Sequence, residues 1–208
     1  MKVKVEKKIG DSVMSFETGY LAKQAAAAVL IQYNDTVVLS TAATGTPRPG
    51  IDFFPLMCDY RERTCAAGKF PGGFIKREGR PTTKETLTAR LIDRPIRPMF
   101  APGFKNEVQC QNFVLSSDKQ TDGDVLAMNG TSTACFISPM PFQDPVASTR
   151  VARVEGRAAR EEHEGEHAQA PHVHGEGVLR AHDLVQARAR ARAMARATAR
   201  ATARASLG

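Results

Sequence analysis

The chain has 208 residues, of which 42% are hydrophobic and 25% are charged, and its formal net charge is +7. These are ordinary values for a soluble globular protein, and no window approaches the roughly 18 apolar residues that a membrane-spanning helix needs. Because residues 1–6 alternate charge with valine and lack the apolar stretch of a signal peptide, we expect a cytoplasmic protein with no membrane partner.

Six short strands are predicted in the first part of the chain. Alternating or β-branched runs bounded by turn residues place them at residues 3–5, 13–17, 28–33, 36–41, 53–60 and 108–115. The alanines at 25–28 favour helix locally. The two runs that flank Asn34 and Asp35 nevertheless match a hairpin with a two-residue turn, so we predict two strands there.

Two helices are predicted after these first strands. Thr82 and Glu85 have the spacing of a capping box, which begins a helix. Pro95 lacks a backbone donor and disfavours helix at the residue before it, so we expect a kink or an end near Arg94. A second helix is expected to begin at Asp124 as its N-cap. Strand hairpins followed by helices predict the α+β class.

A glycine-bounded loop precedes the first helix. Residues 68–81 contain two phenylalanines and four cationic side chains. In such a loop Phe74 can stack on a base while Lys76, Arg77 and Arg80 hold phosphates, which indicates binding to a single-stranded polyanion. The alternative is a solvated loop whose Phe74 covers the core.

Three arginines follow on the first predicted helix. Arg90, Arg94 and Arg97 are spaced so that they share one helical face if the helix continues past Pro95, and with the loop they form a cationic footprint for a single-stranded polyanion. The alternative is structural ion pairing, in which Asp93 binds Arg97 or Arg90.

The composition changes abruptly near residue 151. Residues 1–151 hold all 10 Phe and all 4 Cys, and the cysteines lack a C-x-x-C pair, which predicts reduced and mostly buried thiols. Residues 152–208 hold 16 Ala and 10 Arg and no aromatic side chain. We predict a folded domain over 1–151 and a low-complexity, disordered or loosely helical tail over 152–208. His163 and His167 in this tail match H-E-x-x-H, but the polar surroundings argue against a zinc site.

Several sequence blocks occur in a familiar order along the chain. They cover residues 16–19, 52–56, 66–74, 76–81, 90–98, 106–109 and 124–130. Together they resemble the first RNase PH-type domain of bacterial polynucleotide phosphorylase (polyribonucleotide nucleotidyltransferase) up to about Val151. The resemblance implies an α+β, RNase PH-like (ribosomal protein S5 domain 2-like) core. We expect this core to be truncated, and we interpret the change after Val151 as a shifted reading frame.

The resemblance also implies an activity. Family enzymes are 3′-to-5′ phosphorolytic exoribonucleases that act in mRNA degradation, use inorganic phosphate as co-substrate and Mg²⁺ as cofactor, and release nucleoside diphosphates reversibly. The implied partners are single-stranded RNA, two further copies in a homotrimer and RNA degradosome components, without DNA. The implied RNA-binding residues are Phe74, Lys76, Arg77, Arg80, Arg90, Arg94 and Arg97.

Catalysis by this chain alone is not expected. The family's phosphate-binding turn and metal-binding aspartates belong to a second core, so we expect no catalytic residue and no metal ligand here. One alternative is a non-catalytic RNA-binding or assembly module of an RNase PH-type ring. Another is an exosome-type subunit that needs a partner core.

Overall fold

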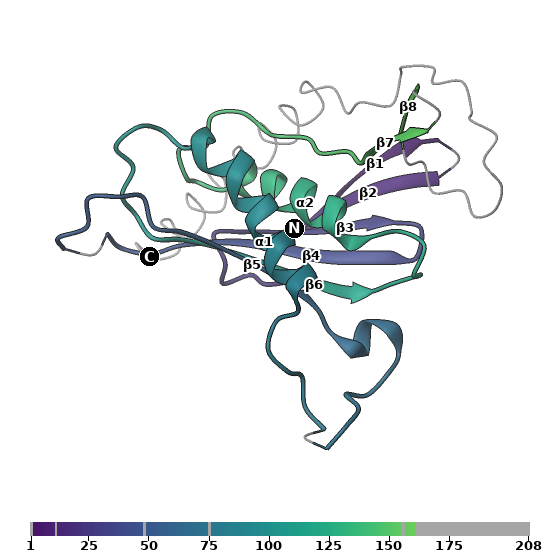
Figure 1. The fold of residues 1–208 in the computed structure, drawn as a ribbon. Helices are drawn as coiled ribbons and strands as arrows, with labels where there is room; N and C mark the ends of the chain where they lie inside the picture. The colour runs from purple at the N-terminus through teal and green to yellow at the C-terminus, as the bar shows by residue number, and fades with distance from the viewer. Residues whose placement is uncertain (1, 11, 48, 75, 155–156, 161–208) are drawn as a thin grey trace, which may run out of the picture. The chain divides into compact units, whose positions relative to one another are not determined.

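The computed structural model describes residues 2–10, 12–47, 49–74, 76–154 and 157–160. Its elements in chain order are β1 (Val3–Ile9), β2 (Ser12–Thr18), β3 (Ala27–Tyr33), β4 (Thr36–Thr44), β5 (Leu56–Glu62), the 3-10 helix η1 (Thr64–Ala67), α1 (Thr83–Ile96), the 3-10 helix η2 (Arg97–Met99), β6 (Val108–Ser116), α2 (Gly123–Ile137), β7 (Val151–Val154) and β8 (Arg157–Arg160). A mixed sheet with two helices confirms the predicted α+β class (Figure 1). The predictions made for residues 161–208 lie outside the described residues.

The main sheet has six strands in the order β1-β2-β3-β4-β6-β5. All neighbouring pairs are antiparallel except β5 and β6, which are parallel. Parallel neighbours cannot be joined by a tight turn, so the chain must cross over between them. The crossover contains η1, the glycine-bounded loop and α1, and it therefore places the loop next to the edge strand β5.

The hairpin predicted around residues 34–35 is confirmed as β3 and β4. Tyr33 pairs with Thr36 across a turn in which Asn34 adopts a left-handed conformation with φ 52°. The alternate residues Val29 and Ile31 of β3 are buried to within 1% of full burial. Burial of this strand face outweighs the local helix preference of the alanines.

The strand predicted at 53–60 is shifted along the chain. It begins at Leu56 and runs to Glu62. Pro55 has no backbone donor for a ladder, although its carbonyl accepts from Val108 N at 3.0 Å. The ladder with β6 therefore begins only after the proline.

Both helices contribute to one core against the sheet. In Figure 1 they lie over the same face, with α1 packed on β5 and α2 on β3 and β4. Ile92 and Ile96 of α1 and Leu126 of α2 are almost completely buried. A Cβ at Gly130 would clash with the Ser40 side chain, so the absence of a side chain at this position allows α2 to approach the sheet closely.

The start of α1 is as predicted, and the helix ends just after the predicted position. Glu85 N–H donates to Thr82 Oγ1 at 3.2 Å and Thr82 N–H donates to Glu85 Oε2 at 2.6 Å, which completes the capping box. The helix passes through Pro95 and ends at Ile96, where η2 begins, so the α-helix ends close to Arg94; the kink that was the other expectation stays a prediction. Proline removes one hydrogen bond, but full burial of Ile96 favours continuation of the helix.

The start of α2 lies earlier than predicted. Asp122 is the N-cap residue and Gly123 the first helical residue, so Asp124 lies in the first turn instead of capping it. Asp122 makes no side-chain cap because its carboxylate binds Arg150 and Lys84.

The last described elements form a short antiparallel hairpin. β7 pairs with β8, with Val151 opposite Arg160. β7 and β8 thus extend from the last residue of the predicted domain, Val151, into the range 152–208, for which a disordered or loosely helical tail was expected. Within the described part of the chain, no helix is long and apolar enough to cross a membrane.

Candidate nucleic-acid interface

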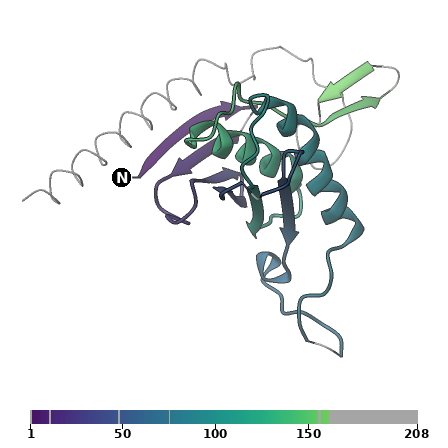
Figure 2. The same ribbon diagram turned by 90° about the vertical axis from the view of Figure 1, so that its left-hand side faces the viewer.

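The loop between η1 and α1, described at residues 68–74 and 76–81, extends beyond the end of the sheet in two perpendicular views (Figures 1 and 2). Gly68 ends η1 in a left-handed conformation with φ 67°, and Gly73 has φ 84°. Phe70 is 94% exposed and Phe74 is 103% exposed. The alternative in which Phe74 covers the core is therefore wrong, and this aromatic face is open to a ligand.

The cationic side chains of the loop are also exposed. Lys69, Lys76, Arg77 and Arg80 all lie on the surface, and Lys76 has a left-handed backbone with φ 49°. None of these four forms an ion pair within the described part of the chain. Cations that are not neutralised internally attract a polyanion most strongly.

The three arginines at the helix have different surroundings. Arg90 and Arg94 are exposed on α1. Arg97 binds the Asp93 carboxylate at 2.7 Å and donates to the carbonyls of Phe54 at 3.0 Å and Leu56 at 3.1 Å. The predicted structural ion pair is therefore confirmed for Arg97, and Asp93 pairs with Arg97 instead of Arg90.

Two neighbouring hollows lie along β5. One, of about 510 Å³, is at the foot of the loop and is lined by Arg80, and the other, of about 560 Å³, is between β5 and α1 and is lined by Arg90. Asp59 and Glu85 border both hollows. The structure thus brings Arg80 and Arg90 to adjoining hollows. The remaining predicted residues line neither of these hollows, and they are Phe74, Lys76, Arg77, Arg94 and Arg97.

Two further arginines near the loop were missed in the sequence. Arg61 and Arg63 line the hollow at the foot of the loop. The Arg63 guanidinium lies 5.5 Å from the ring centroid of Phe113, and Arg61 lies 3.6 Å from Asp59. Their alternate spacing beside Glu62 at the end of a predicted strand was the signal available, because alternate strand residues share a face.

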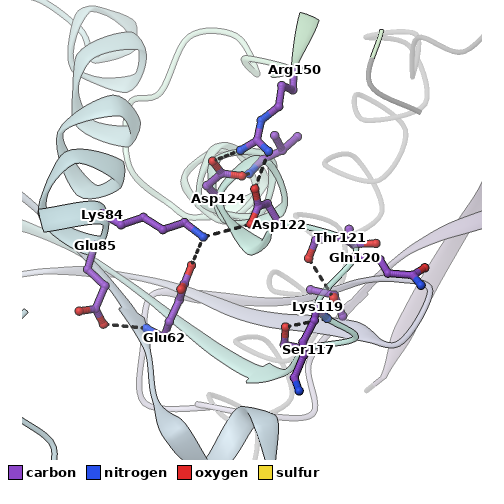
Figure 3. A network of polar contacts seen from close by, with 12 residues as sticks. Glu62, Lys84, Glu85, Ser117, Lys119, Gln120, Thr121, Asp122, Asp124 and Arg150 are labelled. Carbon is purple, nitrogen blue, oxygen red and sulfur yellow. Dashed lines mark hydrogen bonds and ion pairs between the residues drawn. The ribbon is translucent and has the colours of Figure 1, made fainter. Parts of the chain in front are cut away.

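A network of charges fixes the first turn of α1, directly after the loop (Figure 3). Lys84 Nζ lies 3.2 Å from Glu62 and 3.0 Å from Asp122. Arg150 binds both Asp122 and Asp124 at the start of α2. The hydrogen bond from Arg150 lowers the pKa of Asp122 below its ordinary value. The network therefore joins β5, α1 and α2 at the point where the exit arm of the loop, residues 76–81, leads into α1.

Glu85 is a structural carboxylate. Besides closing the capping box, it accepts from Glu62 N–H at 2.9 Å. Burial opposes its ionisation, but the backbone hydrogen bonds from Thr82 and Glu62 outweigh burial and lower its pKa. A carboxylate held in its charged form by these donors is suited to capping and unsuited to proton transfer near neutral pH.

The described residues do not fit a divalent metal. Among them, no three His, Cys, Asp or Glu side chains are grouped to hold an ion. The carboxylates of Glu62, Asp122 and Asp124 are occupied by lysine and arginine partners, whereas Mg²⁺ needs free oxygen ligands in octahedral geometry. We therefore derive no chemical step through a metal on these residues.

The four thiols differ in burial, and Cys58 lines the hollow between β5 and α1. Cys110 and Cys135 are buried with their Sγ atoms 3.7 Å apart, Cys58 is half-buried and Cys65 is exposed. The hydrogen bond with Cys110, together with burial, raises the pKa of Cys58 far above its ordinary value. Two of the four thiols are thus fully buried, and Cys58 stays protonated.

Comparison with known proteins identifies the family. The family model described as 3′ exoribonuclease family, domain 1 (RNase PH) matches residues 13–141. The chain belongs to this family. It is 69% identical over 156 residues to the polyribonucleotide nucleotidyltransferase of Rhodopirellula baltica, covering 75% of the chain and 21% of that relative. It is 53% identical over 148 residues to the same enzyme of Sorangium cellulosum, covering 71% and 20%. The chain thus spans about a fifth of the length of these curated relatives.

Solved structures share the fold. Rrp46 of rice (Oryza sativa) matches with a TM-score of 0.51 at 10% identity, covering 77% of the chain and 67% of Rrp46. An Archaeoglobus fulgidus exosome structure with RNA bound to the active site matches with a TM-score of 0.52 at 13% identity, covering 77% of the chain and 65% of that one. The predicted RNase PH-like fold is therefore confirmed, and the resemblance to polyribonucleotide nucleotidyltransferase is confirmed over about three quarters of the chain.

Proposed function

We propose that the chain is the first RNase PH-type domain of a polyribonucleotide nucleotidyltransferase, and that its loop holds single-stranded RNA for 3′-to-5′ phosphorolysis. The observation that carries this proposal is the exposed set of Phe74, Lys76 and Arg77, whose cations form no ion pair within the described residues. The named relatives support the activity.

The chemistry of the loop suits this role. Each phosphate neutralised by Lys76, Arg77 or Arg80 releases counterions, which gives affinity without sequence preference. Phe74 can stack on any base, because every base has a π face. An enzyme that degrades RNA of any sequence needs such sequence-independent binding. Arg90 and Arg94 extend the cationic surface onto α1, while Arg97 supports the fold.

Phosphate, Mg²⁺ and the assembly partners are not assigned to the described residues. We propose that inorganic phosphate and Mg²⁺ act at a second core of the longer relatives, and that the full-length protein works in the cytoplasm in mRNA degradation. A homotrimer with degradosome partners belongs to the same proposal. On this basis the 208-residue chain alone binds RNA and releases no nucleoside diphosphate.

The salt dependence of RNA binding tests the loop. The double variant Lys76→Gln/Arg77→Gln removes two phosphate contacts. The negative slope of log affinity against log salt concentration, measured with a labelled oligoadenylate, should therefore become less steep by about 1.4. The matched control Lys23→Gln/Lys105→Gln removes the same charge from exposed lysines outside the loop. Equal slopes for the two double variants would contradict the proposal.

A second candidate is a non-catalytic RNA-binding or assembly module. The exposed cations of the loop support it, because they can bind RNA without any catalytic step. Phosphate-dependent release of nucleoside diphosphates from poly(A) distinguishes the two, measured for the chain alone and after mixing with a second-core protein. Product only in the mixture supports the enzyme domain. RNA retention without product in either sample supports the module.

A further inference from the structure

One side chain joins the two arms of the loop at its base. Glu78 Oε1 accepts hydrogen bonds from Thr64 N–H at 3.0 Å and from Thr64 Oγ1 at 2.8 Å. Thr64 begins η1 before the loop, and Glu78 lies on the exit arm, 14 residues later. Within the described residues, no other side chain of 69–80 forms a hydrogen bond or an ion pair.

The entry arm to which Glu78 binds is itself fixed. Lys69 N–H donates to Thr64 O at 3.1 Å, and Gly68 N–H donates to Cys65 O at 3.0 Å, which closes η1. Ser117 N–H donates to Ala66 O at 3.1 Å and ties η1 to the end of β6. The Glu78–Thr64 contact therefore attaches the exit arm to η1, which the sheet holds in place. Among the described residues the exit arm has no other side-chain contact of this kind.

We infer that Glu78 is a positioning residue for RNA, because its bonds to Thr64 hold Phe74, Lys76 and Arg77 as a preformed set. This inference rests on the proposed function. A loop that is ordered before binding loses less conformational entropy when the ligand arrives, and the affinity rises accordingly. The Glu78–Thr64 contact restricts the ends of the segment that carries these three side chains.

The charge of Glu78 makes the inference sharply testable. A carboxylate beside a phosphate chain repels it, so an acidic residue without a positioning role weakens RNA binding, and removing it tightens binding. A positioning residue has the opposite effect, because removing it loosens the loop. The two roles therefore predict changes in affinity of opposite sign.

The first measurement is the affinity of the full chain for a labelled single-stranded oligoadenylate. Glu78→Ala should weaken binding by roughly three- to tenfold, the effect of losing one typical solvent-exposed hydrogen bond. Thr64→Val should weaken it less, because the backbone donor remains. Glu78→Gln should bind at least as tightly as the unaltered chain, because its amide oxygen can still accept both bonds and the repelling charge is gone. Thr64→Ser should bind as tightly as the unaltered chain, because it keeps both donors. Asp144→Ala, which removes an exposed acid outside the loop, serves as the charge control.

The second measurement does not involve RNA. Chymotrypsin cleaves after Phe74, a bond to which Glu78 does not belong, and loss of the contact should speed cleavage there while the urea midpoint of the chain stays unchanged. If Glu78→Ala binds RNA as tightly as or more tightly than the unaltered chain, the inference is overturned. If Glu78→Ala speeds cleavage but Lys76→Gln/Arg77→Gln leaves RNA binding intact, the proposed function is wrong and the positioning role is overturned with it.

Discussion

Arginines that are close in the sequence differ in what their guanidinium groups contact. Arg94 is exposed on α1, whereas Arg97 binds Asp93 and two backbone carbonyls that precede β5 or lie at its start. The planar guanidinium can bind a carboxylate and carbonyl oxygens at once, which lysine cannot reproduce. Arg97 therefore contributes to the fold, and Arg94 remains available to a ligand.

Substitution of these two arginines should separate stability from binding. Arg97→Ala removes the bonds to the Asp93 carboxylate and to the Phe54 and Leu56 carbonyls, and it should lower the free energy of unfolding by about 1–3 kcal/mol in urea denaturation. Arg94→Ala should change it by less than about 0.5 kcal/mol, since surface substitutions rarely do more. In RNA-binding assays Arg94→Ala should reduce affinity. Equal destabilisation by both variants would contradict the conclusion that Arg97 supports the fold while Arg94 is available to a ligand.

At the level of elements, the crossover between two parallel strands decides where the loop lies. β5 and β6 are parallel neighbours, so the chain between them must leave one end of the sheet and return at the other. α1 makes the return over the sheet, and the loop occupies the bend before it (Figure 1). The close approach of α2 to β4 at Gly130 completes the core that supports this crossover.

A methyl group at this approach should be poorly tolerated. Gly130→Ala brings Cβ into the Ser40 side chain, which is held by Asn112 at 2.6 Å, and overpacking of this kind should destabilise the fold by about 1–3 kcal/mol. Gly72→Ala is the matched control, because nothing lies near a Cβ at that position. Thermal or urea unfolding measures both. A Gly130→Ala variant as stable as Gly72→Ala would contradict the packing described.

At the scale of the whole molecule, ion pairing links the elements and makes stability depend on pH. Hydrogen bonding to Arg150 lowers the pKa of Asp122, and backbone donors lower that of Glu85 despite its burial. Burial disfavours the charge of Lys84, but its bonds to Asp122 and Glu62 raise its pKa overall. Each charged form is thus favoured by folding.

The sign of the pH dependence follows from these shifts. The two carboxylates stabilise the fold above their unfolded pKa values, 3.8 for Asp122 and 4.5 for Glu85, and the stabilisation is lost as pH falls through the lower folded values. The Lys84 contribution is lost only above 10.5. The urea midpoint should therefore fall below about pH 4. In Asp122→Asn the urea midpoint should decrease less between neutral and acidic pH. A urea midpoint that rises as the pH falls would contradict the conclusion that these charged carboxylates stabilise the fold.

The sequence by itself determined the features that depend on neighbouring residues. The Asn34 turn, the Thr82–Glu85 capping box and the exposed cationic loop follow from local turn chemistry, capping and polarity. The family blocks determined the fold and the candidate RNA-binding residues. The first residue of β5 and the N-cap of α2 were misplaced, because strand pairing and ion pairing with distant residues set them.

Only the tertiary structure decided which charges remain free. Arg97 finds its carbonyl acceptors 41 and 43 residues away, and Arg63 meets Phe113 on a neighbouring strand. The Glu78–Thr64 contact exists because η1 is held at the end of β6. These partners depend on the parallel pairing of β5 with β6, and such long-range pairing leaves no local pattern in the sequence from which it could be derived.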